Sequence, residues 1–343
     1  MQQPPICLIL ASGNRISPAE VSATMQRRTF VASAAAGAVL PAAAQTSQPL
    51  PMATLGKSGL RVTRIAVGGY HMNMRGVEEA LRILRRALDL GINFYDSANS
   101  YHGGRSDELL GKAFSGADRQ KILLMTKCEV YSRDGAMRVL EEQLRRMKTD
   151  YIDLWQCHQV SEHKEVDQIL GPNGSLEAFV LAKKQGKVRH IGFTGHRDPA
   201  IHLRLLQATD AWETIQMPIN LIDPHYLSFI RQVLPEARRR GLGVIAMKSN
   251  AMGQITAQNV AAIADCLRFT WSQDIDVLVS GVETVAQLEQ NVAALRSFQK
   301  MTPQEISAML GRTAKGKTGS GVERYKRSPQ GACLRPHRDG EPA

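Results

Sequence analysis

From about residue 50 to residue 300, short β-prone runs alternate with helical runs, and this alternation limits the possible folds more than any other feature of the chain. A strand, a helix and a further strand in that order form a parallel pair with a right-handed crossover. Eight such units close into a barrel, whereas an open doubly wound sheet more often has five or six strands. The sequence therefore predicts an α/β fold, a (β/α)₈ TIM barrel, with strands at 64–67, 92–95, 122–126, 152–156, 188–193, 214–217, 243–247 and 277–280.

Apolar residues at helical spacing mark the segments between these strands. In the run VEEALRILRRALDL at 77–90, apolar residues recur at the spacing of the buried face of an amphipathic helix. Gly91, Gly186 and Gly241 each follow a run of this kind, where glycine commonly ends a helix. The predicted helices are 77–90, 137–147, 176–185, 227–240, 260–271 and 285–295.

A short segment before the first strand predicts an N-terminal β-hairpin. The sequence MATLGKSGLRV places the turn residues Lys57, Ser58 and Gly59 between two β-prone pieces. We expect this hairpin to close the N-terminal mouth of the barrel. The barrel is expected to span 50–300, about the ~250 residues typical of this fold, and a C-terminal helix and a basic tail are expected over 301–343.

The N-terminal region has the pattern of a targeting segment rather than of a folded element. Arg27 and Arg28 are followed by a weakly apolar, alanine-rich run and by small residues at 42–44 that suit a cleavage site. The paired arginines predict a twin-arginine signal peptide over 25–44 and export by that machinery, to the periplasm. Residues 1–24 are then an extension upstream of the true start. The alternative is a disordered alanine-rich leader on a cytoplasmic protein.

The composition argues against several classes of partner. The formal net charge of +11 is partly concentrated in the tail, where no aromatic residues interleave with the basic run as base-stacking platforms would. We therefore expect no nucleic-acid binding and a solvated basic end that includes Arg324, Lys326 and Arg327. The five cysteines form no CxxC pair, which argues against a disulfide framework and a metal site. No run reaches the ~18 apolar residues of a membrane-spanning helix.

The stretch GRTAKGKT at 311–318 matches the letters of a P-loop. A P-loop follows a strand and opens a helix. This stretch follows the helix-like run EISAML instead, so we interpret it as a chance match.

Polar residues end or follow consecutive predicted strands. Asp96 follows the strand at 92–95, Tyr101 lies in the next loop, Lys127 closes LLMTK and His158 closes YIDLWQCH. Because the C-terminal strand ends of a barrel converge on one rim, we expect these side chains to meet. Each alone has an ordinary explanation, such as a surface ion pair or a core hydrogen bond. Four of them at consecutive strand ends favour a catalytic site.

The same four side chains suit hydride addition to a carbonyl group. Negative charge develops on the carbonyl oxygen, and a tyrosine, with a reference pKa of ~10, can donate a proton there. A nearby ammonium group stabilises the phenolate and lowers that pKa. Lys127 can supply this ammonium group, Asp96 can hold Lys127 in place, and His158 can orient the substrate oxygen. Tyr101 is therefore the predicted general acid/base.

These segments resemble the aldo-keto reductase family over roughly residues 52 to 300. The resemblance implies an NAD(P)(H)-dependent oxidoreductase whose catalytic tetrad is Asp96, Tyr101, Lys127 and His158. The substrate that it implies is a small aldehyde, ketone or sugar, or the corresponding alcohol. The matching segments are TLGKSGLRV, GINFYDSANSYHGGRSDELLGKAF, LLMTK, YIDLWQCH, VRHIGFTGH and SGVETVAQLEQN.

The resemblance also implies where the nicotinamide end of the cofactor binds. Thr194, Gly195 and His196 stand at positions that contact the nicotinamide amide, where family members usually carry Ser-Asn. Gln216 corresponds to a glutamine that binds the same amide. Met247 stands where many members stack a tyrosine on the ring. A methionine is a soft apolar surface that can pack there, although a core role is almost as well supported.

The phosphate end departs further from the family pattern. Ser280, Gly281 and the start of the following helix can bind phosphate through backbone N–H groups. Glu283 stands where members that prefer the 2′-phosphorylated cofactor often carry a basic residue. Its carboxylate would repel a 2′-phosphate, or could bind a ribose hydroxyl, so NADP and NAD both stay open. The predicted set at this end is Lys248, Ser280, Gly281, Glu283, Gln287 and Asn291.

Two other classes of function compete with this enzyme. The same barrel could be a nucleotide-sensing regulatory subunit with slow turnover that serves a partner, and an intact tetrad weakens that reading. It could also be a cofactor-independent isomerase or lyase, which the tetrad and Gln216 disfavour. Substrate specificity would come from loops at 69–76, 129–134, 159–173 and 249–255.

Overall fold

The computed structural model describes residues 49–314 and 321–327. The predicted signal peptide at 25–44 and the extension at 1–24 lie outside the described residues. So do the parts of the basic tail at 315–320 and 328–343. Within the described ranges, no helix is long and apolar enough to cross a membrane.

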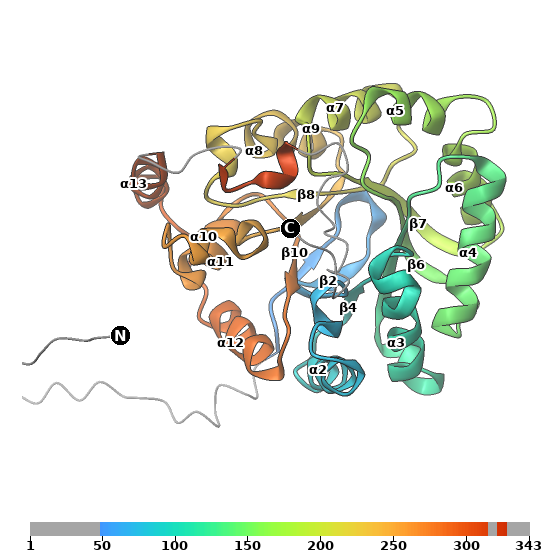
Figure 1. The fold of residues 1–343 in the computed structure, drawn as a ribbon, viewed down its shortest axis with the longest axis horizontal. Coiled ribbons are helices and arrows are strands. Elements are labelled where there is room, and N and C mark those ends of the chain that lie inside the picture. Colours follow the sequence, from blue (N-terminus) through green and yellow to red (C-terminus); the bar gives the residue numbers. More distant parts are fainter. Residues whose placement is uncertain (1–48, 315–320, 328–343) are drawn as a thin grey trace, which may run out of the picture. The chain divides into compact units, whose positions relative to one another are not determined.

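The predicted barrel is confirmed. Eight parallel strands close in the order β10-β3-β4-β5-β6-β7-β8-β9, with helices arranged around them (Figure 1). Every predicted strand overlaps an observed one, with bounds that differ by at most a residue or two. The strands are β3 (Ile65–Gly68), β4 (Phe94–Asp96), β5 (Leu123–Cys128), β6 (Ile152–Cys157), β7 (Val188–Thr194), β8 (Thr214–Pro218), β9 (Gly243–Met247) and β10 (Val277–Gly281).

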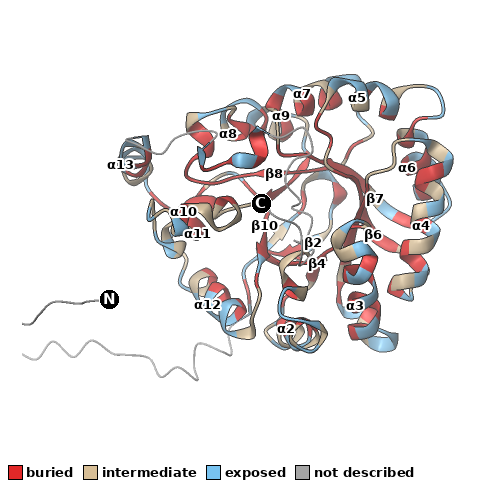
Figure 2. Ribbon diagram, in the orientation of Figure 1, coloured by how far each residue is buried: buried red, intermediate tan, exposed pale blue. Residues whose placement is uncertain are grey.

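The helices cover the barrel with their apolar faces turned inward. Figure 2 shows buried residues on the strand-facing side of the helices and exposed residues on the other side. In α2, the buried positions are Ala80, Ile83, Leu84 and Ala87, which is the spacing that the sequence predicts. The helices of the barrel are α2 (Val77–Asp89), α3 (Arg105–Ala113), α4 (Arg133–Met147), α5 (His163–Leu170), α6 (Ser175–Lys184), α7 (Pro199–Ala208), α8 (Phe229–Gln232), α9 (Leu234–Arg239), α10 (Gln254–Ala257), α11 (Ile263–Ser272) and α12 (Val285–Arg296).

The predicted helix at 227–240 is divided into α8 and α9. Pro235 lies at the start of α9, where a residue without a backbone N–H is tolerated but cannot continue the preceding turn. The helices α3, α5 and α7 were not predicted, and α5 lies inside the predicted loop at 159–173. A signal for α7 was present, because Asp198 caps its N-terminus and Pro199 follows at the first helical position.

The predicted hairpin is present and closes the N-terminal end of the barrel. Strands β1 (Met52–Thr54) and β2 (Arg61–Thr63) pair antiparallel. Leu55, between them, is buried in a cluster with the barrel-interior residues Phe94 and Leu154. Gly56 has a φ of 46°, and a Cβ there would lie 2.1 Å from the backbone nitrogen of Gly243. Only glycine therefore lets the hairpin approach the strands this closely.

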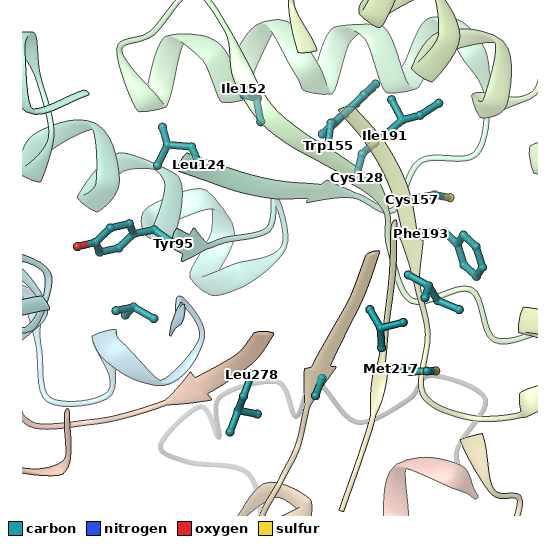
Figure 3. Packing of buried hydrophobic residues seen from close by; sticks show 14 of the residues in the cluster. Tyr95, Leu124, Cys128, Ile152, Trp155, Cys157, Ile191, Phe193, Met217 and Leu278 are labelled. Carbon is teal, nitrogen blue, oxygen red and sulfur yellow. The ribbon is translucent and has the colours of Figure 1, made fainter. Parts of the chain in front are cut away.

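The largest apolar cluster lies between the strands and the helices. Leu124, Ile152 and Trp155 belong to it and are drawn in Figure 3. The ring of Trp155 stacks on Phe179 of α6, with 4.0 Å between the ring centroids. This layer fixes the strand positions, and hence the positions of the side chains at the strand ends. The cysteines of the described part are buried free thiols, Cys128, Cys157 and Cys266.

The C-terminal region contains the expected helix, α13 (Pro303–Ala314). Gly311 lies within this helix, so the P-loop-like letters do not follow a strand. The expectation of a solvated basic end is wrong for Lys326. Its side chain is fully buried and forms ion pairs with Asp223 and Glu323, which offset the cost of removing its charge from water.

Candidate active site

The structure brings the four predicted catalytic residues together at the C-terminal rim of the barrel. Asp96 is the last residue of β4, Lys127 lies near the end of β5, and His158 follows β6 directly. Tyr101 begins a 3₁₀ turn, η3 (Tyr101–Gly104), in the loop after β4. Neighbouring parallel strands place these positions side by side, as the barrel predicts.

Lys127 is the centre of this group. Its ammonium nitrogen is paired with the carboxylate of Asp96 and donates a hydrogen bond to the backbone oxygen of Ser97 at 2.7 Å. It lies 3.3 Å from the hydroxyl oxygen of Tyr101. Both charged side chains of the ion pair are almost completely buried, so water screens their charges little. The Lys127 ammonium group is therefore held against the Tyr101 hydroxyl.

Asp96 is held from two sides. Burial raises the pKa of its carboxyl group, and the charge of Lys127 and hydrogen bonds from Lys127 and Gln216 offset part of that rise. Gln216 lies in β8, which places a predicted cofactor residue beside the catalytic ion pair. Its Oε1 atom is buried and has no hydrogen-bond partner within the described residues.

His158 lies on the other side of Tyr101, with 5.7 Å between the two ring centroids. Its Nδ1 atom is 3.5 Å from the Ser100 hydroxyl and 3.7 Å from a carboxylate oxygen of Glu129. Burial lowers the pKa of His158 to about 4, although Glu129 acts against that shift. The ring is therefore neutral near pH 7 and can share one N–H in a hydrogen bond.

Glu129 and its partners were not predicted as site residues. Asn99 donates a hydrogen bond to Glu129 at 3.0 Å and accepts one from Arg146 of α4, also at 3.0 Å. Burial alone would raise the pKa of Glu129, but His158 and Asn99 bring it below its ordinary value. This chain of contacts ties His158 to α4. A single sequence gives no signal for it, because the partners come from separate loops and a helix.

A cavity of about 520 Å³ opens beside the tetrad. Asp96 and Tyr101 line it, whereas Lys127 and His158 are not among its lining residues. Most of the predicted cofactor residues line it as well, namely Gln216, Met247, Lys248, Ser280, Gly281, Glu283, Gln287 and Asn291.

Thr194, Gly195 and His196 do not line the cavity. Thr194 ends β7 and pairs in register with Gln216. A Cβ at Gly195 would lie 2.4 Å from the backbone oxygen of Val160 and 2.6 Å from the ring of His202, so the position admits only glycine without rearrangement. His196 is buried against Tyr325. Thr194 is thus next to the cavity-lining Gln216, whereas the neighbours named for Gly195 and His196 do not line the cavity.

The far end of the cavity is built from β10 and the N-terminus of α12. Asn291 donates a hydrogen bond to the Ser280 hydroxyl at 2.9 Å, and Gln287 accepts one from the backbone N–H of Glu283 at 2.8 Å. A Cβ on Gly281 would collide with the ring of His71, so this stretch of backbone borders the cavity closely. The predicted phosphate-end residues therefore form one continuous wall.

The loop after β3 contributes residues that were not predicted individually. Tyr70 and His71 line the cavity, and the ring of Tyr70 packs edge-on against Tyr101 at 5.5 Å. Arg75 forms a partly exposed ion pair with Glu283 at 3.2 Å. The carboxylate expected to repel a 2′-phosphate is thus partly neutralised by a basic residue from another strand–helix unit, which reading the final loop alone could not detect.

These residues fit a nicotinamide dinucleotide. The Gln216 oxygen is a buried acceptor within the described part of the chain, and the amide of a nicotinamide has an N–H to donate. The α12 N-terminus and the Ser280–Gly281 backbone suit a phosphate. Within the described residues, no group of three or more His, Cys, Asp or Glu side chains could hold a metal ion.

The molecule is a closed parallel barrel with polar groups gathered at its C-terminal rim, where enzymes with this fold carry their active sites. The model of the aldo/keto reductase family matches residues 64–265, and the chain belongs to that family.

Relatives of known name cover most of the chain. L-galactose dehydrogenase of Arabidopsis thaliana is 27% identical over 313 residues, which cover 76% of this chain and 94% of the relative. L-glyceraldehyde 3-phosphate reductase of Escherichia coli O157:H7 is 25% identical, with 74% and 76% covered. The uncharacterized oxidoreductase YrpG of Bacillus subtilis is 33% identical, with 58% and 66% covered.

Solved structures share the fold. The holo form of the aldo-keto reductase AKR11C1 from Bacillus halodurans superposes with a TM-score of 0.67 at 22% identity, covering 80% of this chain and 99% of that one. An aldo-keto reductase from Klebsiella pneumoniae in complex with NADPH superposes with a TM-score of 0.64 at 20% identity, covering 79% and 97%.

Proposed function

We propose that the protein is an NAD(P)(H)-dependent oxidoreductase that reduces the carbonyl group of an aldehyde, ketone or sugar, or oxidises the corresponding alcohol. The observation that carries this proposal is the position of the Lys127 ammonium group, paired with Asp96 and 3.3 Å from the Tyr101 hydroxyl. This is the arrangement in which a tyrosine can give up and recover a proton.

The residues of the chain divide the work around the reacting carbonyl. When bound, the dinucleotide supplies or accepts the hydride. Tyr101 donates its hydroxyl proton to the oxygen as the hydride reaches the carbon, and in oxidation it takes that proton back. Lys127 stabilises the phenolate that remains, and Asp96 keeps Lys127 in place. Neutral His158 would hydrogen-bond the substrate oxygen and orient it.

Gln216 would hold the nicotinamide amide, because its buried oxygen has no other hydrogen-bond partner in the described residues. Met247 would pack on the ring as part of the cavity wall. Lys248, Ser280, Gly281 and the α12 N-terminus would hold the phosphates. A solved structure of similar fold carries NADPH, which supports this use of the cavity.

A small hydroxylated carbonyl compound is the first substrate class to test. Two relatives are named for L-galactose and L-glyceraldehyde 3-phosphate. Polar side chains line the same cavity as Tyr101, among them His71 and Asn250. A sugar could form hydrogen bonds with both.

The test combines binding with turnover. Fluorescence titration with NADPH and NADH should show binding, and a panel of aldehydes, ketones and sugars should show turnover that follows the absorbance of the reduced nicotinamide. Absence of binding by either dinucleotide would contradict the proposal and favour an isomerase or lyase. Tight binding with no turnover on any panel member would favour a regulatory subunit.

We also infer that the protein works after export. This inference is supported by the adjacent Arg27 and Arg28, by the alanine-rich run and by the small residues that follow. A cofactor enzyme suits the twin-arginine route, since that route carries folded proteins. The cofactor could then be bound before transport.

A further inference from the structure

The C-terminal segment 321–327 returns to the rim of the barrel. Val322 and Tyr325 are buried in an apolar cluster with Leu221 and Ile222 of the loop after β8 and with Met309 of α13. Every third residue of the segment, including Arg324 and Arg327, is exposed. The segment therefore has one face that packs on the barrel and one face that meets solvent.

A buried polar cluster fastens this segment. The Lys326 ammonium nitrogen lies 2.8 Å from a carboxylate oxygen of Asp223 and 2.6 Å from one of Glu323, and all three side chains are fully buried. Lys326 also donates a hydrogen bond to the backbone oxygen of Tyr226 at 2.8 Å. Removing one member of a buried ion cluster leaves an uncompensated charge, so the cluster specifies where the segment lies.

Asn220 connects the same cluster to the end of β8. Its amide nitrogen donates hydrogen bonds to Glu323 at 2.8 Å and to the Tyr325 hydroxyl at 3.0 Å. The Tyr325 hydroxyl in turn donates to Glu323 at 2.5 Å. Asn220 is four residues after Gln216. The Tyr325 side chain is thus held at its backbone by the packing of the segment and at its hydroxyl group by Asn220 and Glu323.

The Tyr325 ring lies against two of the predicted cofactor residues. The ammonium nitrogen of Lys248 is 5.2 Å from the ring centroid, within the range of a cation–π interaction. The ring of His196 packs edge-on, with 5.7 Å between centroids and an interplanar angle of 89°. Lys248 lines the cavity, and its φ of 58° is a left-handed conformation that lysine rarely adopts. Tyr325 therefore supports a side chain whose position costs backbone strain.

We propose that Tyr325 is a positioning residue of the cofactor site. Its ring packs on His196 and holds Lys248, which lines the cavity, in place for the dinucleotide. The cluster of Asn220, Asp223, Glu323 and Lys326 keeps Tyr325 there. This inference rests on the proposed function, because it assumes that the cavity binds NADP or NAD. The inference gives segment 321–327 a role in cofactor affinity, although the segment does not itself line the cavity.

The direct test measures dinucleotide affinity in the full chain. Tyr325→Leu removes the ring face under Lys248. A cation–π contact of about 0.5–2 kcal/mol corresponds to a rise in Kd of roughly 2- to 30-fold for NADPH. The rise should appear in KM for the dinucleotide rather than in kcat. Arg324→Ala is the matched control, since it removes an exposed cation from the same segment and should leave Kd unchanged.

A double-mutant cycle separates positioning from general destabilisation. Lys248→Met should raise Kd by itself, and Tyr325→Leu in that background should add little, because Tyr325 acts through Lys248. Fully additive effects would overturn the proposal. Tyr325→Phe keeps the ring and should bind more tightly than Tyr325→Leu, which gives a second comparison if Tyr325→Leu folds poorly.

The outcomes also distinguish this inference from the proposed function. If the wild-type protein binds neither NADPH nor NADH, the proposed function fails, and the inference fails with it. If the wild type binds a dinucleotide and a folded Tyr325→Leu variant binds it with the same Kd, only the inference is overturned. Circular dichroism of each variant establishes that it is folded.

Discussion

The ammonium nitrogen of Lys127 lies 3.3 Å from the hydroxyl oxygen of Tyr101, and its other contacts are with Asp96 and the backbone of Ser97. A positive charge held in this way favours the phenolate form of a neighbouring tyrosine. Lys127 also forms a buried ion pair with Asp96. Replacing Lys127 should therefore lower both the activity and the stability of the protein.

Lys127→Met should reduce turnover and lower the free energy of unfolding. The substitution leaves the buried Asp96 carboxylate without its partner, which costs about 3–5 kcal/mol for a buried pair. Chemical denaturation measures the loss. In the double variant Asp96→Asn/Lys127→Met, much of the stability should return while turnover stays low. A single variant with wild-type stability and an unchanged pH–rate profile would show that the two residues are not coupled to Tyr101.

Stability should fall as the pH falls from about 6.5 to about 4. Burial lowers the pKa of His158 to about 4, whereas the reference value is ~6.5. Between these values the unfolded chain binds more protons, so stability rises with pH; the contribution is fully present above pH ~6.5 and is lost towards pH ~4. The full contribution of His158 to the free energy of unfolding is about 3 kcal/mol.

His202, whose pKa burial lowers to about 3, adds to the same pH dependence. The measurement is therefore the difference between wild type and His158→Gln in unfolding experiments across this pH range. The variant should show the shallower dependence. Parallel curves for the two proteins would mean that His158 is not held neutral by its surroundings.

Cofactor preference should respond to the charge at position 283. Glu283 lies on the cavity wall and is partly neutralised by Arg75, so we expect weak discrimination between NADPH and NADH. Glu283→Arg should shift kcat/KM towards NADPH by roughly tenfold, since one charge-assisted contact is worth about 1.5 kcal/mol. Arg75→Ala should shift it the other way.

The control for this charge change is Glu289→Arg. Glu289 lies on the same helix, α12, but is paired with Arg86 and does not line the cavity. Glu289→Arg should leave the preference between NADPH and NADH unchanged. A strong wild-type preference for NADPH that survives Glu283→Arg would place the 2′-phosphate elsewhere.

The barrel was predictable from the sequence because each strand carries its own local signal. The run YIDLWQCH, for example, becomes β6 followed by His158. Strand order then brought Asp96, Lys127 and His158 together through one rule about parallel barrels. This rule needs no knowledge of side-chain packing.

Contacts between distant segments were not predictable in this way. The pairs Arg75–Glu283 and Lys248–Tyr325 join residues that are far apart in the sequence. Lys326 looked like one of many tail cations, and only folding places it beside Asp223. Charge patterns along a sequence do not reveal such pairs, because an exposed and a buried lysine have the same local signature.

Export can be tested with the two arginines alone. Replacing Arg27 and Arg28 with lysine keeps the charge but alters the twin-arginine pair, so the precursor should accumulate in the cytoplasm. Cell fractionation and mass spectrometry of the N-terminus measure this. A wild-type protein that is wholly cytoplasmic, with residues 25–44 intact, would contradict the predicted signal.

Tyr101→Phe is the most direct test of the proposed chemistry, because it removes a single hydroxyl group. A single-turnover experiment mixes the preformed complex of enzyme and reduced dinucleotide with a carbonyl substrate and follows the loss of nicotinamide absorbance. We predict a rate at least ~10²-fold below that of wild type, as expected for loss of a general acid, with the Kd for the dinucleotide unchanged. A rate near that of wild type would exclude Tyr101 as the proton donor.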